Sequence, residues 1–143
     1  MAVVVGGVIE KNGKYLLVQE AQKECYGKWN LPAGRLDFNE SIVDGAIREV
    51  KEETNCDIEV TGICQVGNRL REDSLFLTVV FQTRLLSDDI KFNTDEILSA
   101  KWFSYEEILA MEESLRSPDF IVNAIKNCCN DIVGSLELLQ LIK

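Results

Sequence analysis

Hydrophobic and polar positions along the chain predict strands first, then one long helix, then more strands and finally further helices. Runs rich in β-branched apolar residues occupy residues 2–10 and 15–20, and the Asn12-Gly13 pair between them is typical of a hairpin turn. Further strands are predicted at residues 57–67, 74–86 and 97–103.

Residues 41–54 are predicted to form an amphipathic helix. At about 100° per residue, one apolar stripe is formed by Ile42, Val43, Ala46, Ile47 and Val50. Asp44, Arg48 and Lys51 fall on the opposite face, which we expect to be solvated. The helix should therefore pack one side against the rest of the chain.

Two further helices are predicted nearer the C-terminus. Ser104 and Glu107 have the capping-box spacing, so a helix should begin there and end at about residue 113. Ser117 is predicted as the N-cap of the next helix, with Pro118 at its first position. The apolar stripe of that helix is formed by Phe120, Ile121, Ala124, Ile125 and Cys128. The tail from Ile132 fits either a short helix or a docked strand.

The order of these elements predicts the fold class. Strands, a helix, more strands and then helices suit an α/β sandwich in which a mixed sheet lies between helices. The 143 residues contain no repeat and no low-complexity linker, so residues 1–143 are expected to form one domain. The apolar start is short and ends in charge, which indicates a strand, and we expect a soluble cytoplasmic protein.

The charge and the residue types exclude several classes of function. A net charge of −9 argues against non-specific nucleic-acid binding and against binding to anionic membranes. The chain has no histidine, which excludes histidine-based acid–base chemistry, histidine-dependent nucleophilic sites and the common zinc ligand sets. The five cysteines include no C-x-x-C and are expected to be reduced and mostly buried, the alternative being a reactive thiol at Cys25.

Several carboxylates converge on the predicted helix 41–54. Glu49, Glu52 and Glu53 are neighbours at helical spacing and lie at the edge of the apolar stripe. Carboxylates repel one another and are costly to desolvate, so a hard divalent cation such as Mg²⁺ is a physical reason for them to converge. The alternative is a solvated acidic face with an ordinary ion pair between Arg48 and Glu52.

The segment GRLDFNESIVDGAIREVKEETNC, residues 34–56, resembles the signature of the Nudix hydrolase superfamily. That signature is a glycine, five residues, a glutamate, seven residues, and then Arg-Glu-aliphatic-x-Glu-Glu-x-Gly-aliphatic. The matching positions are Gly34, Glu40, Arg48, Glu49, Val50, Glu52 and Glu53. Asn55 replaces the signature glycine, and Asn is the next most tolerant residue for a left-handed helix end. Cys56 replaces an aliphatic residue and should pack similarly.

The resemblance implies an α/β/α sandwich and Mg²⁺-dependent hydrolysis of a diphosphate linkage, with Mn²⁺ as the alternative ion. Glu49, Glu52 and Glu53 would hold one to three ions, and either Glu52 or Glu53 would be the base. Arg48 would orient these groups and pair with Glu40 as a structural brace. Further metal ligands would come from main-chain carbonyls around Gly34 and from a loop acid. That acid would be Glu96, with Asp95 as the alternative, unless both are simply solvated.

Candidate substrate contacts lie outside the acidic helix. Trp29 and Phe38 would stack on a base, as would Tyr26, although Trp29 and Phe38 fit a hydrophobic core equally well. Arg69 and Arg71, predicted on a loop, would hold phosphate. Arg116, at the start of the last helix, would bind an anion there.

The substrate is less well defined than the reaction. The proline and tyrosine that mark ADP-ribose and diadenosine polyphosphate hydrolases are absent at the corresponding positions, which residues 71–74 occupy. The segments WNLPAGRL, WFSYEEIL and LRSP resemble bacterial Nudix phosphatases of a thiamine-precursor diphosphate and of nucleoside di- and triphosphates. They are also similar to segments of enzymes that hydrolyse oxidised guanine nucleotides.

The expected partner is therefore a small nucleotide or diphosphate, bound by a monomer or a homodimer. The alternatives are an ADP-ribose or nucleotide-sugar pyrophosphatase, and a Nudix-fold sensor that binds a nucleotide without cleaving it. Sensors of that kind typically lack one of the signature glutamates, and all of them are present here.

Overall fold

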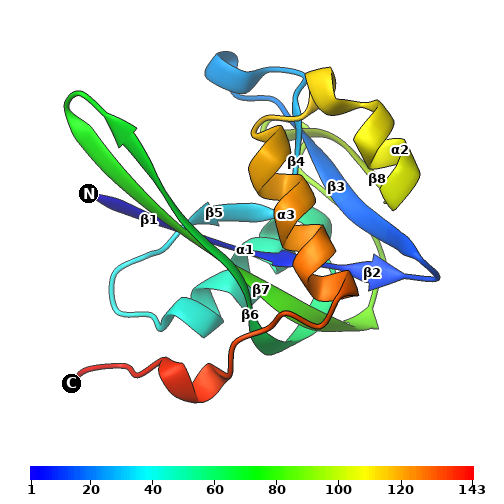
Figure 1. Ribbon diagram of the computed structural model, residues 1–143. Coiled ribbons are helices and arrows are strands. Elements are labelled where there is room, and N and C mark those ends of the chain that lie inside the picture. Colours follow the sequence, from blue (N-terminus) through cyan, green and yellow to red (C-terminus); the bar gives the residue numbers. More distant parts are fainter.

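The computed structural model describes residues 1–143, except for the side chain of Arg71. The chain forms two sheets (Figure 1). One sheet has the strand order β5 (Ala33–Arg35), β1 (Ala2–Val8), β7 (Ser74–Ser87) and β6 (Asp57–Arg71). The other is formed by β2 (Glu10–Lys11), β3 (Lys14–Glu20), β4 (Trp29–Asn30) and β8 (Ile97–Ser104). β1 and β7 are parallel and the neighbouring pairs β1–β5 and β6–β7 are antiparallel, so the first sheet is mixed as predicted.

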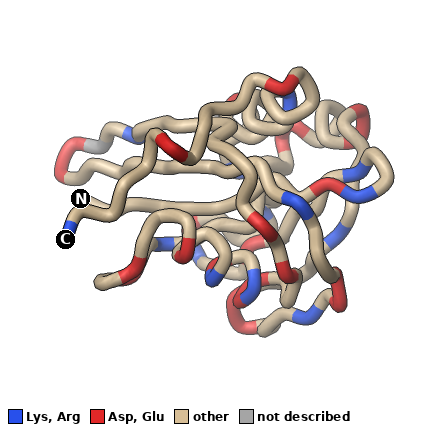
Figure 2. The backbone as a smooth tube through the Cα atoms, turned by 90° about the horizontal axis from the view of Figure 1, so that it is seen from below, with Lys and Arg blue, Asp and Glu red and all other residues tan. Residues whose placement is uncertain are grey.

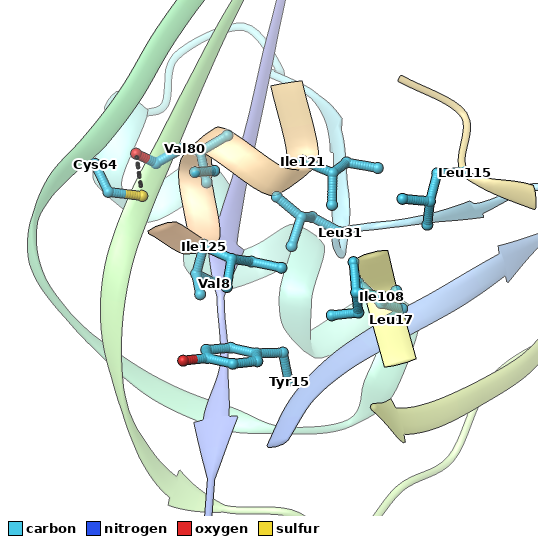
Figure 3. Packing of buried hydrophobic residues seen from close by; sticks show 11 residues of the cluster. Val8, Tyr15, Leu17, Leu31, Cys64, Val80, Ile108, Leu115, Ile121 and Ile125 are labelled. Atoms are coloured by element: carbon cyan, nitrogen blue, oxygen red, sulfur yellow. Dashed lines mark hydrogen bonds between the residues drawn. The ribbon is translucent and has the colours of Figure 1, made fainter. Parts of the chain in front are cut away.

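Helices cover both faces of the mixed sheet (Figure 1). The helices are α1 (Ile42–Thr54), α2 (Tyr105–Ala110) and α3 (Pro118–Cys129), with short 3₁₀ turns η1 (Lys23–Cys25), η2 (Glu112–Ser114) and η3 (Leu136–Leu138). Successive strand residues point to opposite faces, so Val79 and Phe81 pack with α1 while Val80 packs with α3. Figure 3 shows the α3 side of this arrangement, where Val8, Val80, Ile121 and Ile125 meet. The predicted α/β sandwich is confirmed.

The Asn12-Gly13 turn is confirmed, but the strands that it joins differ from the prediction. Only β2 and β3 pair around it, because the chain changes sheets at Ile9, whose carbonyl accepts a hydrogen bond from Leu16 N at 3.0 Å. β1 instead runs parallel to β7. Alternation of apolar residues indicates which face of a strand is buried and does not specify the neighbouring strand.

The caps of α1 are those expected from its sequence. The Ser41 side chain accepts a hydrogen bond from Asp44 N at 3.0 Å, which satisfies a free donor at the N-terminus. Asn55 ends the helix in the left-handed conformation, with φ of 63°, and its N–H donates to Lys51 O at 2.9 Å. Asparagine therefore does at this position what the signature glycine usually does.

The later helices follow their predicted starts more closely than their predicted ends. The capping box of Ser104 and Glu107 is present, but α2 ends at Ala110 and a 3₁₀ turn occupies the rest of the predicted helix. α3 begins at Pro118 as predicted. Ser117 makes no capping bond; its hydroxyl instead accepts a hydrogen bond from Arg69 Nη2 at 2.5 Å.

The C-terminal tail combines the two predicted alternatives. It contains the short helix η3, and Gly134 pairs with Ile63 through backbone hydrogen bonds of 2.8 and 2.9 Å.

None of the described helices is long and apolar enough to cross a bilayer. Acidic residues are distributed over many segments of the backbone (Figure 2).

Candidate active site

The C-terminal half of α1 lies against β5, and Glu53 joins the two elements. Its Oε1 atom accepts a hydrogen bond from the backbone N–H of Ala33 at 2.8 Å. Ala33 is held in turn by pairing with Gly6 on β1. The end of the signature helix is therefore fixed to the mixed sheet through a carboxylate.

Gly34 has no side chain, and the Glu49 carboxylate occupies the space that a side chain at this position would fill. An ideal Cβ at this position would lie 2.0 Å from Oε2 and 2.2 Å from Cδ of the Glu49 side chain, far inside van der Waals contact. A side chain at residue 34 would therefore displace the Glu49 carboxylate. The signature glycine is required here by the close approach of α1 to β5, because the carboxylate occupies the space of a side chain.

Arg48 is the centre of an ion-pair network. Its Nη2 donates to Glu40 Oε1 at 2.6 Å and its Nε to Glu40 Oε2 at 2.9 Å, which is a bidentate pair. Nη2 also donates to the Arg35 carbonyl at 3.0 Å, and Asp37 lies 3.3 Å from Nε. The hydrogen bond from Arg48, with one from the Asp37 backbone, lowers the pKa of Glu40 to about 2.

The same arginine also contacts two of the clustered glutamates. Its Nη1 donates to Glu49 Oε1 at 2.8 Å and to Glu52 Oε2 at 3.2 Å. The Arg48 side chain is only 25% exposed, so the expectation of a solvated Arg48 was wrong. The reason is that helix periodicity does not include the segment before the helix, whose residues Arg35, Asp37 and Glu40 cover that face.

The glutamates of α1 differ in their surroundings. The Glu52 side chain is 55% exposed, whereas burial raises the pKa of Glu53 well above its usual value. The nearby carboxylates of Glu20, Glu49 and Glu96 raise it further, and the Ala33 hydrogen bond opposes them only in part. Burial also raises the pKa of Glu49, although its ion pair with Arg48 acts in the opposite direction.

The sequence did not single out Glu20, the last residue of β3. It is 3% exposed, and its carboxylate acts on Glu53 more strongly than the other charges do. The pairing of β3 with β8 shifts register between Gln19 and Glu20, and such an irregularity redirects side chains. The sequence feature that could have indicated Glu20 is an acidic residue at the end of an apolar strand, directly before a loop.

Glu20 has two partners of its own. Asn30 Nδ2 donates to its Oε1 at 3.3 Å, and Arg116 Nη1 lies 3.7 Å from the same atom. Arg116 is positioned by its backbone N–H, which donates to the Trp29 carbonyl at 2.9 Å. The structure therefore places Arg116 beside Glu20 and brings it toward the acidic cluster.

Glu96 is exposed and approaches the cluster from the loop before β8. Its carbonyl accepts a hydrogen bond from Ala21 N at 3.1 Å, directly after Glu20. Its carboxylate acts electrostatically on Glu53. Asp95, the alternative loop acid, has a backbone N–H that donates to Asn93 Oδ1 at 3.0 Å, and Asp95 is not among the charges that act on Glu53.

The aromatic candidates lie in different environments. Trp29 packs against the core cluster on the α3 side and meets Phe103 edge to face, with ring centroids 5.0 Å apart. Phe38 is 96% exposed, so the core alternative for it was wrong, because its loop lies outside the packed layers. Tyr26 is also exposed.

The remaining candidates are corrected in part. Arg69 lies on β6 and not on a loop, because that strand runs on to Arg71 and pairs with β7 as far as the turn. The side chain of Arg71 lies outside the described residues. Cys25 is buried, and burial raises the pKa of its thiol, which argues against the reactive-thiol alternative.

The donor set suits a hard divalent cation, although it is not assembled as a finished cage. Among the described side chains, no group of three or more is already arranged to hold a metal ion. The carboxylates of Glu20, Glu49 and Glu96 nevertheless all act on Glu53 and raise its pKa. Gly34 allows the Glu49 carboxylate to lie against β5, and carboxylate oxygens are ligands that Mg²⁺ prefers.

The family is established by comparison with known proteins. Residues 1–123 match the model of the NUDIX domain, and the chain belongs to the Nudix hydrolase family. A solved NUDIX hydrolase from Nitrosomonas europaea is 32% identical with a TM-score of 0.88, and the match covers 99% of this chain and 97% of that one.

Curated relatives match over a shorter part of their length. Putative nudix hydrolase 1 of Caenorhabditis elegans is 38% identical over 109 residues, which are 74% of this chain and 28% of that protein. The human 8-oxo-dGDP phosphatase NUDT18 is 35% identical over 104 residues, which are 71% of this chain and 31% of that protein. The match therefore spans less than a third of these two relatives.

Proposed function

We propose that the chain hydrolyses a phosphoanhydride bond in a nucleoside di- or triphosphate, or in a related small diphosphate, with the help of Mg²⁺. The observation that carries this proposal is the convergence of Glu20, Glu49 and Glu96 on the buried Glu53. Such a group of carboxylates attracts a divalent cation, and a cation reverses the local charge so that an anionic phosphate can approach. The family membership supports the same reaction class.

The residues of α1 have different roles in this proposal. Glu49, Glu52 and Glu53, with the backbone at Gly34 and the loop acid Glu96, would hold the cation. When bound, Mg²⁺ or Mn²⁺ would polarise the phosphate oxygens and make the attacking water more acidic. Arg48, braced by Glu40, keeps Glu49 and Glu52 in place through its Nη1 contacts at 2.8 and 3.2 Å.

We assign the role of base to Glu53 rather than Glu52. Glu53 Oε1 is held by Ala33 N–H, which leaves Oε2 to accept a proton. A raised pKa also makes Glu53 a better proton acceptor than an ordinary carboxylate. Glu52 pairs with Arg48 and is largely exposed, which suits a ligand on the outer side of the cluster.

Nucleoside diphosphates, including oxidised guanine nucleotides, are the first substrates to test. The human and mouse relatives of 35% identity are named 8-oxo-dGDP phosphatase. The segments that resemble phosphatases of a thiamine-precursor diphosphate keep that compound as a second candidate. Phe38 and Tyr26 are exposed and remain proposed contacts for a base, whereas the packing of Trp29 favours a structural role. Arg69, Arg71 and Arg116 remain proposed phosphate contacts.

We further propose that residues 1–143 form one domain in a cytoplasmic protein that does not bind nucleic acid or membranes. The free state of the described cysteines suits a reducing compartment. A monomer and a homodimer are both compatible with this proposal, and light scattering would distinguish them.

A substrate panel with Mg²⁺ tests the proposed function. It contains nucleoside di- and triphosphates, oxidised guanine nucleotides, ADP-ribose, a nucleotide sugar and a thiamine-precursor diphosphate, and it measures released phosphate and pyrophosphate separately. We expect phosphate from diphosphates, and none after chelation of divalent ions. Cleavage of ADP-ribose or the nucleotide sugar alone would favour the pyrophosphatase alternative. Tight nucleotide binding without turnover would favour the sensor.

A further inference from the structure

Two cysteines that play no part in the proposed reaction lie together on the other face of the mixed sheet. Cys64 belongs to β6 and is part of the core cluster on that side, and Cys128, in the last turn of α3, packs against this cluster. Their thiols interact with each other, and both are free. The sequence separation of these residues gives no indication of this contact.

The backbone around Cys64 explains the direction of its side chain. The β6–β7 ladder pairs Ile63 with Phe81 and Gln65 with Val80, so Cys64 is the extra residue of a bulge. Its thiol donates to the Val80 carbonyl at 3.4 Å, a contact drawn in Figure 3. A bulge re-aims a side chain and interrupts the regular ladder locally. The Cys64 thiol is thereby directed to the interior beneath α3.

A hydrogen bond also holds the end of α3 at this point. The side chain of Asn127, next to Cys128, donates from Nδ2 to the Cys64 carbonyl at 2.7 Å and to Gln65 Oε1 at 3.1 Å. The backbones that carry the two thiols are therefore tied together. A disulfide between Cys64 and Cys128 would therefore join two segments that hydrogen bonds already hold together.

A small oxidant can reach the pair from outside. A cavity of about 300 Å³ is lined in part by Tyr15, Cys128 and Cys129. Cys64 is buried, Cys128 is partly exposed and Cys129 is exposed, so Cys128 lies between the interior and the cavity. The interaction between the two thiols lowers the pKa of Cys128 and raises the pKa of Cys64, so Cys128 is the more acidic thiol of the pair and the one that attacks first.

We propose that Cys64 and Cys128 form an oxidisable thiol pair that a hydroperoxide converts into a disulfide between β6 and α3. The Cys128 sulfur attacks one peroxide oxygen, the O–O bond breaks, and the thiol proton leaves with the other oxygen as water or alcohol. The resulting sulfenic acid is attacked by the Cys64 sulfur. The S–S bond forms, the S–O bond breaks, and a second water carries away the Cys64 proton. Two thiols are oxidised and one peroxide is reduced.

Cys129 is the competing thiol, and its surroundings differ. Its Sγ lies 2.8 Å from the Tyr15 hydroxyl, and both residues line the cavity. Interaction with Cys129, after burial, raises the pKa of Tyr15. The partner of the Cys129 thiol is therefore the Tyr15 hydroxyl, whereas the partner of the Cys128 thiol is Cys64.

The test treats the reduced chain with hydrogen peroxide, blocks the remaining thiols by alkylation and maps the cross-links by tandem mass spectrometry. We expect a chain that is not cross-linked to another copy and has lost two of its five free thiols, with Cys64 joined to Cys128, and full reversal by dithiothreitol. The variants Cys64→Ser and Cys128→Ser should lose this cross-link. The matched variants Cys56→Ser and Cys129→Ser should keep it.

Several results would overturn the proposal. They are a cross-link between Cys128 and Cys129, a cross-link between two chains, and sulfenic or sulfinic acid at Cys129 without any internal disulfide. Mapping the cross-links in the oxidised parent chain, which carries no substitution, decides between these results even if a serine variant fails to fold. Because neither thiol lies at the acidic cluster, the outcome does not depend on the proposed hydrolysis.

Discussion

The backbone N–H of Ala33 donates a 2.8 Å hydrogen bond to the Glu53 carboxylate, and this contact joins the signature helix to the mixed sheet. A carboxylate in this position is buried among other acids, and its pKa is raised well above the usual value. The contact therefore fixes the geometry of the site at a cost in stability, which a bound cation would offset.

The first prediction concerns the stability of Glu53→Gln without divalent ions. A group with a raised folded-state pKa stabilises the protein below its unfolded-state pKa, and this contribution is lost as the pH rises. At neutral pH the variant should therefore melt a few degrees above the parent chain in EDTA, because the amide oxygen can still accept from Ala33. The difference should shrink toward pH 4.

Added Mg²⁺ should reverse this order, because it binds the parent chain more tightly and stabilises it more. Glu106→Gln is the matched control, since Glu106 is exposed in the first turn of α2. A Glu53→Gln variant that melts below the parent chain at pH 7 in EDTA would show that the carboxylate is not destabilised by its surroundings.

Gly34→Ala should reduce activity without unfolding the protein. The added Cβ would fall 2.0 Å from Glu49 Oε2, so the carboxylate must move away from β5. We expect at least about a tenfold loss of kcat/KM, which corresponds to about 1.4 kcal/mol, and weaker Mg²⁺ binding by calorimetry. Gly134→Ala is the control, because a Cβ there would meet its nearest atom at an ordinary 3.6 Å. Equal activity in the two variants would contradict the role of Gly34.

The pair of Arg48 and Glu40 should contribute measurably to stability. The two side chains are 25% and 15% exposed and share a bidentate contact, unlike an ordinary surface pair. A double-mutant cycle with Arg48→Ala and Glu40→Gln, followed by urea unfolding, should give a coupling free energy of about 1–3 kcal/mol. Lys51 and Asp57, an exposed pair, should give a coupling below about 1 kcal/mol. Similar coupling free energies for the two pairs would contradict the role of Arg48 and Glu40 as a structural brace.

Acid should weaken the protein through Glu40. Its folded-state pKa of about 2 lies below that of an unfolded glutamate, so its stabilising contribution is fully present above about pH 4.5. That contribution is lost as the pH falls toward 2. The urea midpoint should therefore drop more between pH 5 and 3 in the parent chain than in Glu40→Gln. If the urea midpoint fell by the same amount in the parent chain and in Glu40→Gln, the Glu40 carboxyl would have an ordinary pKa in the folded state.

Much of the fold followed from local patterns in the sequence. The caps at Ser41 and Ser104 and the turn at Asn12-Gly13 are short-range features, and the structure contains all of them. The sheet order was not predicted, because the parallel pairing of β1 with β7 joins residues that are far apart in the chain. The length of β6 also exceeded the prediction, since pairing with β7 extends it through polar residues.

The candidate site was predicted where it is continuous in the sequence and missed where it is assembled by the fold. Arg48 and Glu40 lie on one segment, and their pairing matches the expected brace. Glu20 comes from the other sheet, and only the tertiary fold brings its carboxylate near enough to act on Glu53. Burial of an acid depends on tertiary packing, so helix periodicity could not reveal it.

The central claim is that the carboxylates around Glu53 form the catalytic centre. The most direct test measures Mg²⁺-dependent hydrolysis of nucleoside diphosphates by the parent chain, by Glu53→Gln and by the Glu106→Gln control. The account predicts full activity in the control and a loss of about 10²–10⁴-fold in kcat for Glu53→Gln, with an unchanged circular dichroism spectrum. Undiminished hydrolysis by Glu53→Gln would contradict the account and place the reaction elsewhere.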